Sequence, residues 1–268
     1  MKKSNFWVGL NFPILMALSF ALVSCNNNDV KRSETLSEEQ KITKENEVKN
    51  NNTSLEAVLN AKKEAYEKTA DESKKKVYAD GITAVRESGI ESSALQVGDT
   101  APNFNLNNAS GESVELYDYL DKGYVVLTWY RGGWCPYCNL TLQYLQRELP
   151  EFQKYNANLI ALTPELPDSS LNTAEKNELE FEVLSDVGNE VASEYGIVFQ
   201  LTDEVAEYYN KGFGLNEYNG DQSNELPLAA TYVINNNAEI IYAFLDADYR
   251  NRAEPSEITE LLKKNTGM

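Results

Sequence analysis

The sequence predicts an α/β fold in which a central mixed β-sheet is flanked by helices and preceded by an N-terminal helical extension. Three observations support this prediction. From about Val97 onward, short apolar runs alternate with segments of helical pattern, as in α/β proteins. Residues 124–130 are almost continuously apolar, which is expected of a central strand buried on both faces. Two further apolar runs flank residues 235–237, which indicates a β-hairpin.

Residues 1–24 have the pattern of a targeting segment. Lys2 and Lys3 precede an apolar stretch, residues 6–23, and Cys25 follows directly after Leu-Val-Ser. This end resembles the lipobox of bacterial lipoproteins, in which the peptide is cut before the Cys and the thiol is acylated. We therefore expect a lipoprotein signal peptide and lipidation at Cys25, which places the protein in the cell envelope, anchored by lipid and facing the periplasm or the exterior. An uncleaved membrane anchor is the alternative, since about 18 apolar residues is near the lower limit for a span.

The next two segments are polar. Residues 25–54 are rich in Asn and charge without an apolar period, which predicts a flexible linker. Residues 55–95 are predicted to be a helical extension, because acidic residues precede basic ones by four positions and an apolar stripe runs beside them. We expect a helical pair or a broken helix over 55–90, interrupted at Gly81 and Gly89. Its charges are interpreted as a solvated face.

The remaining residues, 96–268, are predicted to form the main domain. Strands are expected at 124–130, 158–163, 181–184, 231–234 and 239–245, and helices at 136–154, 168–178, 187–195 and 255–265. Gly196 is expected to end the third of these helices, and Pro255 to begin the last.

The composition excludes several classes of function. The 268 residues include 24 Lys and Arg, 42 Asp and Glu, and no His, with a net charge of −18. Without an imidazole, Ser-His-Asp and Cys-His catalysis are excluded. The negative charge argues against nucleic acid as a partner, because nucleic-acid binding depends on clustered cations. It also argues against adsorption to anionic lipid, so a lipid anchor is the only membrane attachment expected.

Cys135 and Cys138 lie three residues apart, where the predicted central strand gives way to a helix. A helix N-terminus stabilises an anion, so a thiol there can ionise without a histidine. Pro136 suits the first turn, and Gly132 and Gly133 allow the backbone to approach a reacting sulfur. The two sulfurs can also close on each other. We favour a redox pair over a structural disulfide, which usually closes a longer loop, and over a metal site, which would need more ligands.

Four segments together resemble a known family. They are residues 97–106 (VGDTAPNFNL), 130–139 (YRGGWCPYCN), 226–234 (LPLAATYVI) and 248–255 (DYRNRAEP). These segments are similar to the AhpC/TSA group, the peroxiredoxins of the thioredoxin fold, and in particular to its peroxiredoxin-like branch; the likeness covers about residues 55–268. It implies a thioredoxin-like fold and a thiol peroxidase that acts on a hydroperoxide without a cofactor. A thioredoxin-like dithiol would then restore the thiols.

The resemblance also suggests roles for the thiols. Aligned on the strand, Cys138 falls at the peroxidatic Cys of the motif Pro-x-x-x-Thr-x-x-Cys, Cys135 at its Thr, and Arg131 at its Pro. Thioredoxins instead attack with the first Cys of the pair, beside a cis-Pro whose position Ala229 occupies here. The helical period places Cys138 on the core side and Cys135 at the more open helix entrance. Either thiol is thus a candidate attacker, and the alignment favours Cys138, with Cys135 as the resolving thiol.

Other side chains are weaker candidates. Arg131 is a candidate to stabilise a thiolate by its charge, and Arg250 and Arg252 to reach the site from a strand end. Trp134 is expected to pack beside the thiols, and the tyrosines are interpreted as packing residues.

The sequence therefore predicts an envelope-tethered thiol peroxidase. One alternative is an oxidoreductase that exchanges disulfides with protein thiols, with Cys135 attacking. The other is a lipoprotein that only binds a partner, against which the intact thiol pair argues. The oligomeric state is not predicted.

Overall fold

The computed structural model describes residues 53–108 and 110–267. The predicted signal peptide, Cys25 and residues 25–52 of the predicted linker lie outside the described residues. Within the described ranges, no helix combines the length and the apolar character needed to cross a bilayer.

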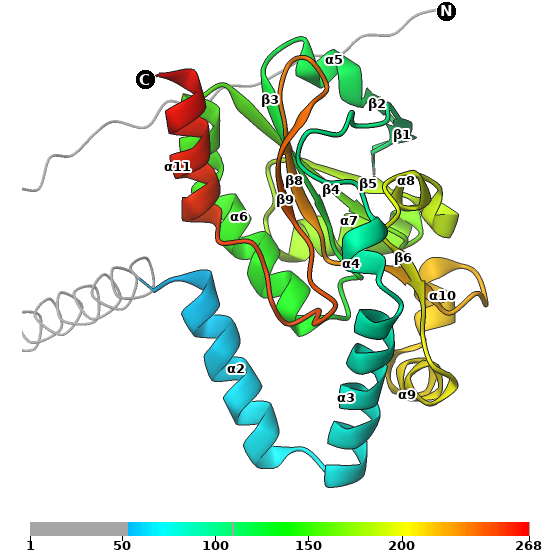
Figure 1. Cartoon of the computed structure of the whole chain (residues 1–268). Coiled ribbons are helices and arrows are strands. Elements are labelled where there is room, and N and C mark those ends of the chain that lie inside the picture. Colours follow the sequence, from blue (N-terminus) through cyan, green and yellow to red (C-terminus); the bar gives the residue numbers. More distant parts are fainter. Residues whose placement is uncertain (1–52, 109, 268) are drawn as a thin grey trace, which may run out of the picture. The chain divides into compact units, whose positions relative to one another are not determined.

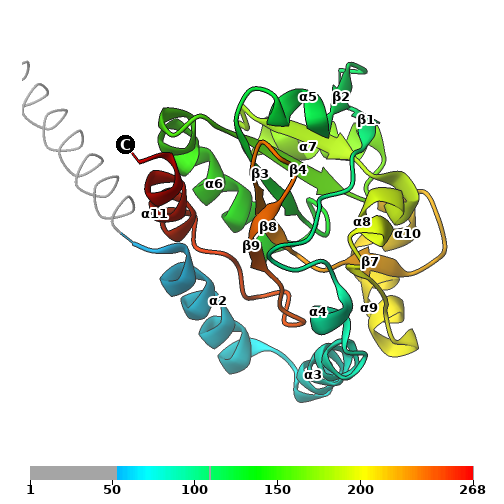
Figure 2. The ribbon, with the colours of Figure 1, turned by 45° about the horizontal axis from the view of Figure 1, so that its top comes forward.

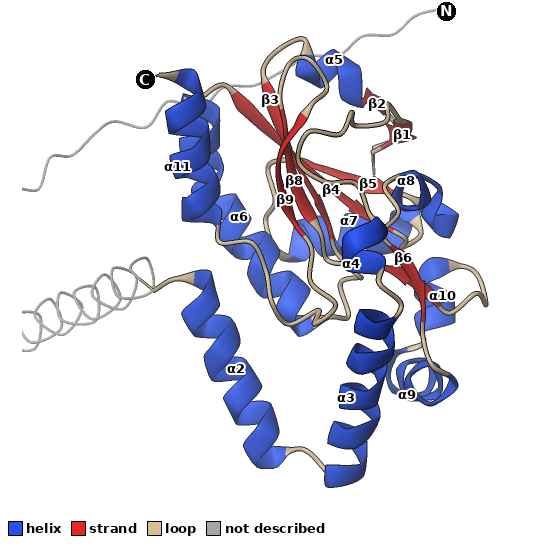
Figure 3. Cartoon of the chain, in the orientation of Figure 1, coloured by secondary structure: helices blue, strands red, loops and turns tan. Residues whose placement is uncertain are grey.

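A five-stranded mixed sheet forms the centre of the fold, in the order β5-β4-β3-β8-β9 (Figures 1 and 3). The middle strand β3 pairs in parallel with β4 and antiparallel with β8. Two small sheets, β1–β2 and β6–β7, lie outside it. The strands are β1 (Asn105–Asn107), β2 (Ser113–Glu115), β3 (Tyr124–Trp129), β4 (Ala157–Thr163), β5 (Glu182–Ser185), β6 (Val198–Gln200), β7 (Glu225–Pro227), β8 (Thr231–Ile234) and β9 (Ile240–Phe244).

Helices cover both faces of this sheet. On one face α6 and α11 lie side by side, and their apolar side chains form a core cluster with alternate residues of β3 and β8 (Figure 2). Residues of α4, α5 and α8 belong to the cluster on the other face. The helices are α2 (Leu55–Thr69), α3 (Glu72–Glu87), α4 (Ile90–Ser93), α5 (Leu116–Leu120), α6 (Pro136–Lys154), α7 (Pro167–Lys176), the 3-10 turn η1 (Val187–Asn189), α8 (Glu190–Glu194), α9 (Asp203–Phe213), α10 (Leu215–Asn219) and α11 (Pro255–Thr266).

The predicted elements of residues 96–268 are confirmed, with ends that differ by at most two residues. The helix predicted at 187–195 is divided into η1 and α8, because Gly188 and Asn189 have positive φ angles of 78° and 56°. Gly196, with a φ of 70°, follows α8 as expected. Several elements were not expected from the sequence: β1, β2 and α5, and also β6, α9, α10 and β7 between residues 198 and 227.

The helical extension is a pair of helices, α2 and α3, as expected, but its break lies elsewhere. The chain turns before Asp71, whose carboxylate caps α3 by accepting two backbone N–H groups. The break expected at Gly81 is wrong, since Gly81 lies inside α3. A Cβ there would come within 2.7 Å of Val205 Cγ2, so this glycine allows α3 to approach α9 closely. Gly89, with a φ of 76°, does separate α3 from α4.

Candidate active site

Both thiols lie in the first turn of α6, directly after the loop that leaves β3. Cys135 is the N-cap residue and Pro136 the first helical residue, as predicted. Cys135 and Cys138 are unpaired thiols, and each residue is only 1% exposed. The more open helix entrance expected at Cys135 is therefore wrong as a statement about solvent exposure, because Cys135 lies in an apolar cluster with residues of α2 and faces a cavity that side chains of α2, α3 and α9 enclose. The expected difference between the two thiols is seen in another way, because Cys135 lines a cavity and Cys138 does not.

Cys138 carries the negative charge of the pair. Burial opposes its ionisation, yet the Cys135 S–H and the charges of Arg252 and Arg131 lower the pKa of Cys138 to about 5. Arg252 Nη2 donates a hydrogen bond to Cys138 Sγ at 3.3 Å. Burial and the neighbouring thiolate raise the pKa of Cys135 well above its usual range. At neutral pH the pair therefore holds one proton, on Cys135.

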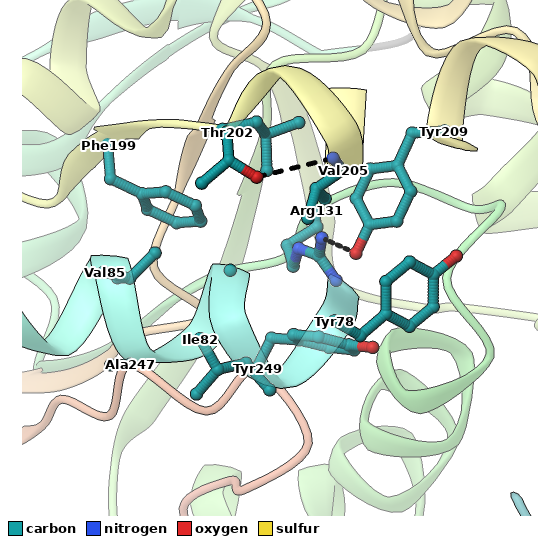
Figure 4. Close-up of a pocket in the computed structure, with 12 residues that line it drawn as sticks. Tyr78, Ile82, Val85, Arg131, Phe199, Thr202, Val205, Tyr209, Ala247 and Tyr249 are labelled. Carbon is teal, nitrogen blue, oxygen red and sulfur yellow. Dashed lines mark hydrogen bonds between the residues drawn. The ribbon is translucent and has the colours of Figure 1, made fainter. Parts of the chain in front are cut away.

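Arg131 is a buried cation without a carboxylate partner in the described part of the chain. It is 1% exposed, and its Nη2 donates to the hydroxyl of Tyr209 at 2.7 Å (Figure 4). Its guanidinium carbon lies 4.0 Å from the ring centroid of Tyr249 and 5.0 Å from that of Trp134. Its Nε has no hydrogen-bond partner among the described residues. A buried charge needs compensation, and the guanidinium helps to lower the pKa of the Cys138 thiol, so the thiolate of Cys138 is the nearby anion that compensates it.

The two remaining arginine candidates differ. Arg252 contacts Cys138 directly. Arg250 lines the cavity but is held by Asp248, whose carboxylate accepts two of its hydrogen bonds, at 2.8 and 3.0 Å. Arg252 is therefore in contact with the Cys138 sulfur, whereas Arg250 lines the cavity in front of Cys135.

Glu165 is a buried residue of the site that was not expected from the sequence. It follows β4, is 0% exposed, and accepts the Gly133 N–H at 2.9 Å. Burial, together with the nearby Cys138, raises its pKa to about 7. A signal was present, because the ends of parallel strands meet at one edge of a sheet and Glu165 follows the strand next to β3. Gly133 does make a close approach, but to Thr173 rather than to a sulfur, since a Cβ there would lie 2.1 Å from Thr173 Oγ1.

A cavity of about 230 Å³ lies in front of Cys135. Trp134 lines it and stacks on Phe213 at 4.2 Å between ring centroids, which confirms that Trp134 packs beside the thiols. Several tyrosines that were interpreted as packing residues do pack on other rings and also line this cavity, and Lys74 of the helical extension, whose charges are otherwise mostly exposed, lines it too. The lining residues of these two kinds from outside α6 and its loop are Tyr66, Lys74, Tyr78, Tyr209 and Tyr249.

A second, much smaller cavity of about 20 Å³ lies between α3 and α9 (Figure 4). It shares Arg131, Tyr78, Tyr209 and Tyr249 with the larger one. The guanidinium therefore forms part of the wall of both. In the described residues no three His, Cys, Asp or Glu side chains are grouped to hold a metal ion.

Comparison with known proteins matches the AhpC/TSA family model to residues 97–243. The chain is 28% identical over 132 residues to the thiol-disulfide oxidoreductase ResA of Bacillus thuringiensis, covering 49% of this chain and 74% of ResA. It is 30% identical over 164 residues to ResA of Geobacillus kaustophilus, covering 60% and 75%. It is 29% identical over 103 residues to peroxiredoxin Bcp of Escherichia coli, covering 38% and 65%.

Solved structures support the same fold. Peroxidoxin BcpB of Mycobacterium tuberculosis superposes with a TM-score of 0.51 at 19% identity, covering 63% of this chain and 97% of that one. A PrxQ mutant of Xylella fastidiosa gives 0.51 at 17% identity, covering 64% and 97%. The predicted thioredoxin-like fold is therefore confirmed. From its sequence match and its architecture, the chain belongs to the AhpC/TSA family.

Proposed function

We propose that the protein is a thiol peroxidase that reduces organic hydroperoxides, with Cys138 as the attacking thiolate and Cys135 as the resolving thiol. The burial of both sulfurs behind a cavity of about 230 Å³ carries this proposal. A hydroperoxide is small enough to enter such a cavity. A disulfide of a folded protein must instead bring its own sulfur into line with the attacking one, which requires an exposed thiol.

The chemistry proceeds in two steps. The Cys138 thiolate attacks the hydroxyl oxygen of the hydroperoxide, so an S–O bond forms as the O–O bond breaks and the sulfur loses two electrons to the peroxide. The leaving alkoxide takes the proton of Cys135 and becomes an alcohol. Cys135 then attacks the sulfenic acid, forming the disulfide, and the displaced hydroxide takes a proton from solvent. Because Cys135 lines the cavity and Cys138 does not, side chains at the cavity wall must move to let the hydroperoxide reach Cys138.

Disulfide formation also changes the electrostatics of the site. The disulfide is neutral, so Arg131 loses the thiolate that compensates its charge. Leaving a buried ion unpaired is destabilising by about 3–5 kcal/mol. We infer that this destabilisation loosens the covering helices in the oxidised form and admits a thioredoxin-like protein. That dithiol supplies two electrons and is itself oxidised to a disulfide.

Single-thiol variants test the assignment. Cys135→Ser is expected to react once with hydroperoxide and stop as a sulfenic acid, which dimedone labels at Cys138 and mass spectrometry locates. Cys138→Ser is expected to lose the reaction. Labelling at position 135 in the Cys138→Ser variant, at the wild-type rate, would refute the assignment.

Disulfide exchange is the second candidate, and one observation favours it: Cys135 is the thiol that lines the cavity. Several relatives are named thiol-disulfide oxidoreductases, which also supports it. In that case Cys138→Ser would accumulate a mixed disulfide between Cys135 and a protein thiol. Cys135→Ser would then be inactive toward protein disulfides.

We also propose that the protein is lipid-anchored in the cell envelope, from the sequence around Cys25. Metabolic labelling with a fatty acid is expected to mark the wild type and not Cys25→Ser. Label that persists in the variant would refute the anchor.

A further inference from the structure

The cavity in front of Cys135 differs in charge from the rest of the protein. The chain has 42 acidic and 24 basic side chains. The cavity, however, is lined by three cations, Lys74, Arg131 and Arg250, and by no acid. Seven aromatic side chains make up most of the remaining wall. A site with this lining attracts a ligand that is both anionic and apolar.

The three cations are not equally available to a ligand. Arg250 is compensated by Asp248, with hydrogen bonds of 2.8 and 3.0 Å. Arg131 is fully buried and serves the thiolate. Lys74 is half-buried, and its Nζ lies 5.5 Å from the ring centroid of Tyr78. Lys74 makes no ion pair with a carboxylate in the described part of the chain, so it is the cation left for a ligand.

The aromatic wall indicates the shape of that ligand. The rings of Tyr66 on α2 and Tyr78 on α3 are stacked, with centroids 6.2 Å apart and planes within 11°. The rings of Trp134 and Phe213 form a second stacked pair in the same wall. Flat aromatic surfaces favour a planar ring. A cavity of about 150 Å³ is enough for benzene, so about 230 Å³ suits one substituted ring.

Resting on the peroxidase function proposed above, we propose that the preferred substrate is a single-ring aromatic hydroperoxide that carries a carboxylate, and that Lys74 selects this charge. The ring lies against the aromatic wall, the hydroperoxide group faces the thiols, and the carboxylate lies beside Lys74. The helical extension thus supplies the specificity of the site, since Tyr66, Lys74 and Tyr78 all belong to it. The assignment holds whichever thiol attacks first.

A matched pair of substrates tests this proposal. Cumene hydroperoxide is neutral, and its para-carboxylate differs only by the anionic group. The wild type is expected to show a kcat/KM about tenfold higher for the carboxylate, the size of one charge-assisted hydrogen bond. In Lys74→Gln the ratio of the two kcat/KM values falls to about one, and in Lys74→Glu the neutral substrate becomes the better one. Taking the ratio within one variant cancels any general change in thiol reactivity.

Lys76→Gln is the matched control. Lys76 lies on the same helix but is exposed and paired with Asp80, so its loss is expected to leave the ratio at the wild-type value. Equal kcat/KM values for the two hydroperoxides in the wild type would overturn the inference, and so would a preference that survives Lys74→Glu. In either case the peroxidase function would stand.

Binding of an unreactive ligand distinguishes the proposed ligand class from the proposed peroxidase function. Calorimetric titration with para-isopropylbenzoate is expected to show binding to the reduced wild type that is lost in Lys74→Glu and kept in Lys76→Gln. If that pattern appears while no hydroperoxide is reduced, the ligand class stands and the peroxidase function is wrong. If para-isopropylbenzoate does not bind the wild type, the inference is wrong even where hydroperoxides are reduced.

Discussion

The two faces of the central sheet differ in what they bury. On one face Trp129 packs against Tyr195 and Tyr232, with ring centroids 4.8 and 6.0 Å away, inside a large apolar cluster. On the other face the protein buries the thiolate of Cys138, and the guanidinium of Arg131 is buried just past the end of the same strand. The first face gains stability from apolar burial, whereas the second holds charges that destabilise the fold unless they are compensated.

Adjacent residues produce this difference. Side chains alternate along a strand, so Trp129 and Tyr130 enter opposite clusters. Substitutions on the first face should therefore change the free energy of unfolding, and substitutions around the thiols should change the reactivity of Cys138.

Trp129→Ala is expected to have the largest effect on stability. Truncating a buried Trp removes its packing with two aromatic neighbours and should lower the free energy of unfolding by about 3–5 kcal/mol. Denaturant unfolding measures this loss. The pH profile of Cys138 alkylation in the folded variant should match the wild type, and a shifted profile would show that the two faces are coupled.

Glu165→Gln is expected to alter how stability depends on pH. Burial raises the pKa of Glu165 from 4.5 to about 7, so the folded protein binds more protons than the unfolded chain between these values. Stability from this group is therefore lost as the pH rises from about 4.5 to 7, by roughly 3 kcal/mol in all. Subtracting the unfolding free energies of Glu165→Gln from those of the wild type across this window should reveal the slope. Glu175→Gln, at an exposed position on α7, is the control, and an equal slope there would contradict the assignment.

Arg131→Met is expected to change stability differently in the two redox states. In the reduced protein the variant loses the attraction between guanidinium and thiolate, and the pKa of Cys138 rises above about 5. In the oxidised protein it removes an uncompensated buried charge, so the oxidised form should gain about 3–5 kcal/mol relative to the reduced form. Thermal unfolding of both forms measures this difference. Arg147→Met, an exposed Arg stacked on Tyr144, should show no such difference.

Gly81→Ala is expected to have the smallest effect on stability. Alanine favours a helix by about 1 kcal/mol over glycine, but its Cβ would press on Val205, so the net change should stay within about 1 kcal/mol. Because α3 carries Lys74 and Tyr78, its displacement should alter hydroperoxide turnover more than stability. Addition of Val205→Ala should restore turnover. If it does not, the position of α3 does not determine hydroperoxide turnover.

The sequence predicted the central strand, the thiol pair and α6 closely because these features are contiguous, and a local pattern specifies each of them. Glu165 was missed because its burial depends on two parallel strands ending together, which only the folded sheet shows. Lys74 was interpreted as part of a solvated face and Tyr66 as part of an apolar stripe. The packing of α2 against α6 and of α3 against α9, which brings both residues to the cavity beside Cys135, is visible only in the folded protein. The sequence also could not show that Arg131 lacks a carboxylate partner among the described residues, because its neighbours come from distant parts of the chain.

The single proton held by the thiol pair has an electrochemical consequence. Oxidation of two protonated thiols releases two protons with two electrons, but oxidation of Cys138 as thiolate and Cys135 as thiol releases only one. The midpoint potential of the pair should therefore fall by about 30 mV per pH unit above pH 5, half the usual slope. Near neutrality this couple would be less sensitive to the acidity of its compartment than a dithiol donor that gives up two protons. The direction of electron flow between them would then depend on the pH around the protein.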